Sequence, residues 1–209
     1  MEGAWDVNSI LDAIGRGSSD NILAEAHDQH AYAHESAAID AIEAYAREFA
    51  STPIQPLPWS LFRLFDDTGD RRRFETPFFD RRRALGALEI SVLAGRDVDG
   101  TLLSSLHDFL WAICDEYSWC VPAHFHFLKR PSPIALELFS SETGFYIAEA
   151  LHVLGDKIDR RVADRCRAEI RRRILDSYLG DYPREWWEDG TNNWGAVCAG
   201  AIGITFLYE

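Results

Sequence analysis

Helical periodicity is the sequence feature that most limits how this chain can fold. Apolar residues recur three or four positions apart along most of the 209 residues, which is the spacing of one face of an α-helix. Residues 34–50 give the clearest example. Ile39, Ile42 and Phe49 share one stripe of this segment, while its charged residues lie mostly off the stripe. The pattern predicts an amphipathic helix here and an all-α fold for the chain.

Proline and glycine divide the rest of the chain into further predicted helices. Pro58 begins a short helix that ends before Gly69, and Pro77 stands in the first turn of the next helix. The longer predicted helices are residues 76–94, 99–117, 134–154, 159–179 and 194–208. Residues 118–133 and 180–193 have no helical pattern, and long connections of this kind often carry functional residues.

This order of helices predicts an array of antiparallel hairpins. About seven helices follow one another, joined alternately by a short turn and a longer loop, so successive hairpins must bury their apolar stripes on each other. Such packing favours an α/α solenoid or an incomplete α/α toroid over a four-helix bundle. We treat residues 1–209 as one partial α/α-toroid domain, with residues 1–56 as its N-terminal helical segment.

Composition excludes several classes of protein. The chain is 47% hydrophobic and 12% aromatic, which is enough for a buried core and argues against disorder. Its 21 Lys and Arg against 34 Asp and Glu leave a net charge of -13, which argues against a nucleic-acid partner. No apolar run approaches the roughly 20 residues of a membrane span, and no signal-peptide pattern is present. We therefore expect no membrane association and, by default, a cytoplasmic location.

The cysteines and histidines indicate neither a metal site nor a redox motif. The cysteines are Cys114, Cys120, Cys166 and Cys198. They form no CxxC pair and no zinc-ligand spacing with histidine, so we expect small buried thiols. His27, His30 and His34 would share one helical face but have no carboxylate partner at a clear spacing. We expect no metal and no cofactor.

Two segments are rich in side chains that recognise sugars. In residues 185–195, tryptophans stand beside Asn192 and Asn193; indole faces stack on sugar rings, and carboxamides both donate and accept hydrogen bonds. Alternatively, Asn192 caps the last helix and the tryptophans fill gaps between hairpins. Residues 115–124 have the same character, and their His124 is either a base or sugar ligand or simply a hydrogen-bonded loop residue.

Three arginine runs stand out against the acidic composition. They are residues 71–73, 81–83 and 171–173. By default they belong to solvated helix faces, but some could line a cleft and attract an acidic ligand, because a local field need not follow the net charge.

Six short motifs resemble, in their order, the helical domain of heparinase II/III-type polysaccharide lyases. They are LPWSL at 57–61, FDRRR at 79–83, WCVPAH at 119–124, LFSSETG at 138–144, EIRRRI at 169–174, and WW and NNW within 186–194. The similarity spans roughly residues 57–208. Members of that family pair an incomplete α/α toroid with a C-terminal β-sandwich and cleave uronic-acid polysaccharides in the cleft between them. The resemblance implies the N-terminal toroid portion of such a lyase, with the β-sandwich absent.

The resemblance also implies roles for individual residues. β-Elimination removes the proton on C5 of a uronate and needs the charge at the carboxyl group neutralised. In the family an Asn, often followed by His, neutralises this charge, and a Tyr further along the toroid acts as base or acid. Asn193 matches the catalytic Asn, while Trp194 stands where many members have His. The implied substrate-binding residues are Trp119, His124, Trp187, Asn192 and Trp194, and the implied ligand is an acidic polysaccharide or oligosaccharide.

The parts of the family that supply the Tyr lie beyond residue 209, so we expect this chain alone to be inactive. Its alternative role is a noncatalytic carbohydrate-binding or assembly module, and a third possibility is a structural helical repeat with its tryptophans in the core. If turnover occurs, the base is to be sought among Tyr117, Tyr146, Tyr182 and His124.

The last predicted helix is also expected to form an interface. Ile202, Ile204, Phe206 and Leu207 cannot all be hidden by one preceding hairpin. Soluble monomers rarely leave several such side chains exposed together. The sequence therefore predicts a symmetric homodimer through this helix.

Overall fold

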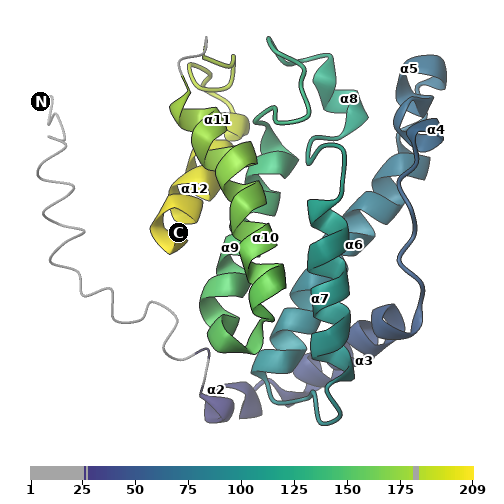
Figure 1. Ribbon diagram of the computed structural model, residues 1–209, viewed down its shortest axis with the longest axis vertical. Coiled ribbons are helices and arrows are strands. Elements are labelled where there is room, and N and C mark those ends of the chain that lie inside the picture. The colour runs from purple at the N-terminus through teal and green to yellow at the C-terminus, as the bar shows by residue number, and fades with distance from the viewer. Residues whose placement is uncertain (1–25, 27, 181–183) are drawn as a thin grey trace, which may run out of the picture.

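The computed structural model describes residues 26, 28–180 and 184–209 (Figure 1). All regular structure in these residues is helical, and none of them lies in a strand. The expected all-α fold is therefore confirmed. Of the three histidines considered above, His27 lies outside the described residues, as does Tyr182.

The helices follow the periodic segments of the sequence. They are α2 (Gln29–Ala33), α3 (Ser36–Ser51), α4 (Trp59–Phe62), α5 (Leu64–Thr68), α6 (Arg72–Leu93), α7 (Thr101–Cys114), α8 (Pro122–Phe125), α9 (Leu138–Leu154), α10 (Arg160–Ile170), α11 (Asp176–Leu179) and α12 (Asn193–Tyr208). A 3₁₀ turn at Gly155–Lys157 follows α9, and a π-helical turn at Arg171–Leu175 joins α10 to α11.

Three long helices, α6, α9 and α12, run parallel in one layer. At their N-terminal ends, the rings of Phe79 and Phe139 lie 4.8 Å apart, and His124 contacts both Phe139 and Trp194. At the other ends of α9 and α12, His152 stacks on Tyr208 with ring centroids 4.6 Å apart. The return helices α7 and α10 lie in front of this layer in Figure 1. This is the alternation that a hairpin array requires, while its curvature into a toroid stays a prediction.

The observed α6 begins earlier than its sequence pattern predicts. The helix starts at Arg72 rather than near residue 76, so Pro77 lies inside it and not in its first turn. Proline has no N–H to donate, which costs one backbone hydrogen bond. The first turn forms nevertheless because Asp70 Oδ1 accepts from Arg73 N and because Phe74 packs in a buried cluster with Phe78. Local capping and aromatic packing outweigh the proline signal.

The π-helical turn interrupts what the sequence predicts as one helix over residues 159–179. In this turn the N–H of Asp176 donates to the carbonyl of Arg171, five residues back. Arg173 and Ile174 are buried there. Ile174 lies against Gly144 of α9, where a Cβ atom would stand 2.6 Å from Ile174 Cγ1. The close approach of the two helices therefore depends on glycine at position 144.

The arginine runs are only partly solvated. Residues 71–73 are exposed, but the side chains of Arg81 and Arg82 are only 9% and 7% exposed, and both donate to the carboxylate of Glu116 at 2.6 to 3.0 Å. Arg173 is 4% exposed and donates to the backbone carbonyl of Glu116 at 2.7 Å. The expectation of solvated faces is wrong for these three, because the carboxylate and carbonyl of Glu116 satisfy guanidinium groups inside the protein.

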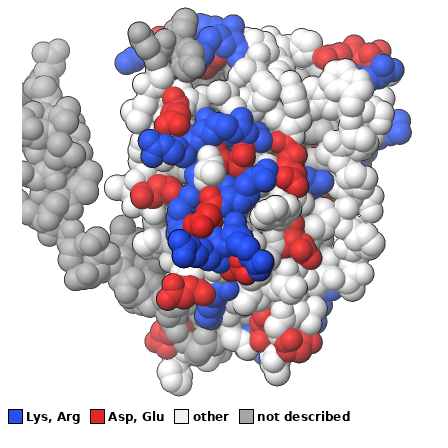
Figure 2. All heavy atoms as spheres, in the orientation of Figure 1, with Lys and Arg blue, Asp and Glu red and all other residues white. Residues whose placement is uncertain are grey.

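Elsewhere the exposed arginines of α10 and of the π-helical turn lie among acidic side chains. Figure 2 shows blue and red groups intermixed over the middle of this face. Arg165 pairs with Asp115 at 2.9 Å, and Arg172 pairs with Glu169 at 2.6 Å. The face is therefore a lattice of exposed ion pairs rather than an uninterrupted basic surface, and each such pair contributes little to stability.

The cysteines and the last helix behave as the sequence predicts. All four cysteines are buried and free of disulfides. On α12, Ile202 is buried against α9, while Ile204, Phe206 and Leu207 are exposed. The apolar content of α12 is thus not hidden by one hairpin, and dimer formation through it stays a prediction. Among the described residues, no helix is both long and apolar enough to cross a membrane.

Candidate functional site

The two sugar-recognition segments of the sequence meet at one end of the molecule. The N-terminal ends of α9 and α12 lie there, at the top of Figure 1, together with α8. Glu137 caps α9 and Asn192 caps α12, and each side chain accepts a hydrogen bond from a backbone N–H of its own helix. Two capped helix ends therefore position the side chains described next.

A buried histidine–glutamate pair is the centre of this site. His124 is 7% exposed and Glu137 is fully buried, and His124 Nδ1 lies 2.6 Å from Glu137 Oε2. The other carboxylate oxygen, Oε1, accepts from the N–H groups of Phe139 and Ser140 at 3.0 and 2.9 Å. Ser140 Oγ accepts in return from Glu137 N at 2.8 Å, which completes a capping box. Glu137 is held by three donors and orients the imidazole.

The bond to Glu137 decides which histidine nitrogen is available. A neutral imidazole that donates Nδ1–H to the carboxylate has Nε2 as its acceptor. Within the described part of the chain, no residue forms a hydrogen bond with Nε2. The pair is therefore arranged to take or give a proton at Nε2, which is the geometry of a general base with an orienting carboxylate.

Aromatic rings surround the imidazole. His124 stacks on Phe139 with ring centroids 5.0 Å apart and an interplanar angle of 14°. Trp194 lies 5.0 Å from His124, and Trp186 lies 4.9 Å from Trp194. Trp186 and Trp194 are only half-buried. The site therefore combines the fixed pair of His124 and Glu137 with two partly accessible indole rings.

The structure brings some of the predicted site residues together and places others in the core. His124 and Trp194 are in contact, Asn192 is the cap of α12, and Asn193 is exposed at its first position. Trp119 and Trp187 are buried, at 1% and 2% exposure. The six predicted site residues therefore do not share one exposed surface, because Trp119 and Trp187 are packed in the core.

The two buried tryptophans have structural partners for their only donor. Trp119 Nε1 donates to the carbonyl of Ile113 at 2.9 Å, and Trp187 Nε1 donates to the carbonyl of Leu136 at 3.1 Å. A satisfied N–H removes the penalty of burying an indole, so a large ring in the core is favourable. Trp119 is therefore a core residue, whereas Trp187, although almost fully buried, also borders the polar cavity described below.

Sequence reasoning missed Glu137, Phe139 and Trp186 as parts of the site. One usable signal was present in the sequence. Glu137 and Ser140 are three residues apart at the start of a helical stretch, which is the capping-box spacing with the acidic and hydroxyl residues exchanged. Nothing in the spacing connects Glu137 to His124, because the intervening segment has no helical periodicity.

Cys120 also lies near the site. Burial, reinforced by the charge of Glu137, raises the pKa of its thiol, so Cys120 is not a ready nucleophile.

A polar cavity of about 790 Å³ lies next to the site along residues 184–188. Arg130, Arg172 and Arg184 line it, together with Glu185 and Glu188. Arg172 belongs to the run at 171–173, so one member of that run does border a cavity. Arg172 is paired with Glu169 and Arg184 with Asp189, so the cavity carries charges of both signs.

No protein-family model matches the chain, and no curated protein matches it. The similarity to heparinase II/III-type lyases therefore rests on the sequence motifs alone. Among the described residues, no group of histidine, cysteine, aspartate and glutamate side chains is placed to hold a metal ion.

Proposed function

We propose that the chain is the helical, toroid-type portion of a lyase-like protein and that it binds uronate-containing oligosaccharides at the His124 end. The observation that carries the proposal is the buried pair of His124 and Glu137 packed against Trp194. Aromatic rings beside a fixed hydrogen-bonding group are the elements that a sugar site needs.

The surroundings of the pair suit a carboxylate on the sugar. The N-terminal ends of α9 and α12 carry partial positive charge, and the exposed side chain of Asn193 stands on the first turn of α12. The neighbouring cavity adds arginine N–H donors, although Arg172 and Arg184 already pair with acidic side chains. We expect an anionic ligand to meet hydrogen-bond donors and the helix N-termini locally, although the chain as a whole is acidic.

His124 also offers an explanation for the tryptophan at position 194. In the lyase family an imidazole commonly follows the catalytic Asn in sequence, and here Trp194 occupies that position. The imidazole of His124 lies 5.0 Å from the Trp194 ring, from another segment of the chain. We propose that His124 takes the part of the missing histidine and that Asn193 keeps the role of neutralising the uronate carboxyl group.

Binding without turnover is the expected behaviour of the 209-residue chain. The family reaction needs a tyrosine as well, and no tyrosine ring among the described residues contacts His124. Acid and base groups act as a unit, so one missing member removes most of the rate. Incubation with heparin, heparan sulfate, alginate and hyaluronan should give no rise in the absorbance of unsaturated uronate; steady product formation would contradict a binding-only role.

Calorimetric titration with oligosaccharides of the same four polymers tests the binding site itself. We expect one of them to bind, and Trp194→Ala to weaken that binding about tenfold, since a stacked ring contributes about 1 kcal/mol or more. Trp111→Ala is the matched control, because Trp111 is also a partly exposed indole but lies on α7. An equal loss in both variants, or no binding by any of the four, would refute the proposed site.

A further inference from the structure

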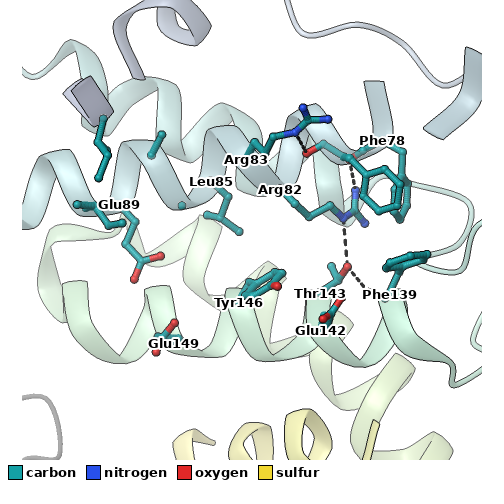
Figure 3. Close-up of a pocket in the computed structure, with 15 residues that line it drawn as sticks. Phe78, Arg82, Arg83, Leu85, Glu89, Phe139, Glu142, Thr143, Tyr146 and Glu149 are labelled. Atoms are coloured by element: carbon teal, nitrogen blue, oxygen red, sulfur yellow. Dashed lines mark hydrogen bonds between the residues drawn. The ribbon is translucent and has the colours of Figure 1, made fainter. Parts of the chain in front are cut away.

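A second cavity lies between α6 and α9, which we call the α6–α9 groove (Figure 3). Its volume is about 720 Å³, within the range of pockets for small molecules. Its walls are mainly apolar and aromatic and include Phe78, Leu85, Ile90, Phe139 and Tyr146. Phe139 also borders the His124 site, but the far end of the groove is ten residues further along α9, or about 15 Å.

Three carboxyl groups face this groove without a partner. Glu142 and Glu149 come from α9, and Glu89 of α6 points across toward Glu149 in Figure 3. Glu89 is only 8% exposed. Among the described residues none forms a hydrogen bond or an ion pair with Glu89. Its oxygens are not among the fully enclosed atoms that lack a partner, so the carboxyl group opens into the groove. A carboxyl group with so little solvent around it is costly to ionise.

The cationic side chains of the groove are already engaged by the protein. Arg82 donates to both oxygens of Glu116 at 2.7 and 2.6 Å, and its Nε donates to Thr143 Oγ1 at 3.1 Å. Arg83 is paired with Asp80 at 3.3 Å. The polar groups that remain available to a ligand are therefore the carboxyl groups of the three glutamates.

We propose that the α6–α9 groove binds a linear alkyl polyamine. The ammonium groups would bond to Glu89 and Glu149 at one end and to Glu142 further along, while the methylene groups pack on Leu85 and the ring of Tyr146. Glu142 and Glu149 are seven residues apart on one helix, so they are separated by about 10 Å. Several ammonium groups joined by short methylene runs fit such a row of acids in an apolar wall, and an ammonium group is also attracted to a tyrosine ring.

The protonation state of Glu89 should change when a polyamine binds. Burial, reinforced by the charge of Glu149, raises the pKa of Glu89 to about 8, so this carboxyl group is mainly protonated at pH 7. Among the described residues, Tyr208 of α12 and Tyr32 of α2 also interact with Glu89; their pKa values are raised, so they stay neutral. Burial raises the pKa of Glu149, and the nearby His152 of α9 opposes that effect. Binding an ammonium group favours the ionised carboxylate and should release a proton.

Calorimetric titration of the whole chain with spermidine tests this inference. Runs at pH 7 in two buffers of different ionisation enthalpy should show saturable binding with release of protons. The affinity should rise steadily from pH 6 to pH 8, because a growing fraction of Glu89 is already ionised as the pH approaches its pKa of about 8. Ammonium chloride, which lacks the methylene groups, should not bind at the same concentration.

Variants separate the groove from general attraction to an acidic protein. Glu89→Gln and Glu149→Gln should each weaken spermidine binding about tenfold, as expected for a lost charge-assisted hydrogen bond. Glu48→Gln is the matched control, because Glu48 is exposed on α3 and lines no part of the groove. Glu149 is only half-buried, so its variant should fold even if the Glu89 variant does not.

Several results would overturn the proposal. These are no saturable binding of spermidine at millimolar concentration, equal weakening in the Glu48 and Glu149 variants, or binding of Mg²⁺ alone with the same dependence on Glu89 and Glu149.

Discussion

Two regions along α9 each bury a glutamate, and the protein treats the two carboxyl groups in opposite ways. Glu137, at the start of the helix, receives two backbone N–H groups and the imidazole of His124. Glu89, packed across from Glu149 further along the helix, receives no donor from any described residue. Burial is nearly the same, so the difference lies in the partners. A satisfied carboxylate belongs to the framework of a site, whereas an unsatisfied one is available to bind something else.

The largest effect is expected at the satisfied glutamate. Glu137→Ala removes the cap of α9 and leaves His124 and two backbone N–H groups without an acceptor. We expect a loss of about 4 kcal/mol in the free energy of unfolding, as for a broken buried pair. Urea denaturation measures it. A loss below about 1 kcal/mol would show that water replaces the carboxylate and that the contrast between the two regions is unfounded.

Glu89 should make the free energy of unfolding depend on pH. Its pKa is about 8 in the folded protein, against the ordinary 4.5, so the folded state binds more protons than the unfolded state between these values. Stability should therefore fall as the pH rises from 5 to 8, by about 3 kcal/mol. In Glu89→Gln, which cannot ionise, this slope should be reduced. Urea denaturation at pH 5, 6.5 and 8 measures how the free energy of unfolding changes with pH. If the wild type and Glu89→Gln show the same dependence, Glu89 must accept a hydrogen bond that keeps its pKa near the ordinary value.

A substitution at Gly144 tests whether the regions around Glu137 and Glu89 are coupled through α9. It lies between them on α9 and faces Ile174 of the π-helical turn. Gly144→Val should cost about 2 kcal/mol, because the added methyl groups overlap Ile174. Since the displacement is directed at Ile174 and not at the α6–α9 groove, the slope of stability between pH 5 and 8 should be preserved. A changed slope would show that the two regions are mechanically coupled.

The smallest effect on folding is expected on the outer side of α12. Phe206 is 37% exposed, so Phe206→Asp should change the free energy of unfolding by less than about 1 kcal/mol. If the predicted dimer forms through this helix, the same change should convert it to a monomer. Light scattering over a dilution series decides the matter, and a wild-type chain that is monomeric at high micromolar concentration would contradict the dimer.

The sequence was informative where one helix face decides the structure. The stripe of Ile39, Ile42 and Phe49 predicts α3 within two residues, and Asn192 was recognised as a candidate cap of α12. The contact between His124 and Glu137 could not be found in this way, since it joins α8 to the cap of α9 across a connection without periodicity. Tertiary packing, not local pattern, brings these side chains together.

Two other features could not be decided from residue type. A tryptophan is suited both to a sugar site and to a core, and only the nearby carbonyls of Ile113 and Leu136 place Trp119 and Trp187 in the core. Glu89, by contrast, left a signal that was overlooked. It falls four residues after Leu85 on the buried stripe of α6, where a charged residue is out of pattern.

The π-helical turn determines which arginine of the run at 171–173 enters the protein. The three side chains are chemically identical, so their chemistry alone cannot choose among them. An α-helix turns by about 100° per residue, and the one extra residue held in Arg171–Leu175 shifts the downstream face by that amount. Loss of a single residue from this turn would restore regular winding and carry Arg173 away from the carbonyl of Glu116. The length of this segment, counted in residues, is thus itself a structural constraint, and a one-residue deletion here would do more harm than many substitutions.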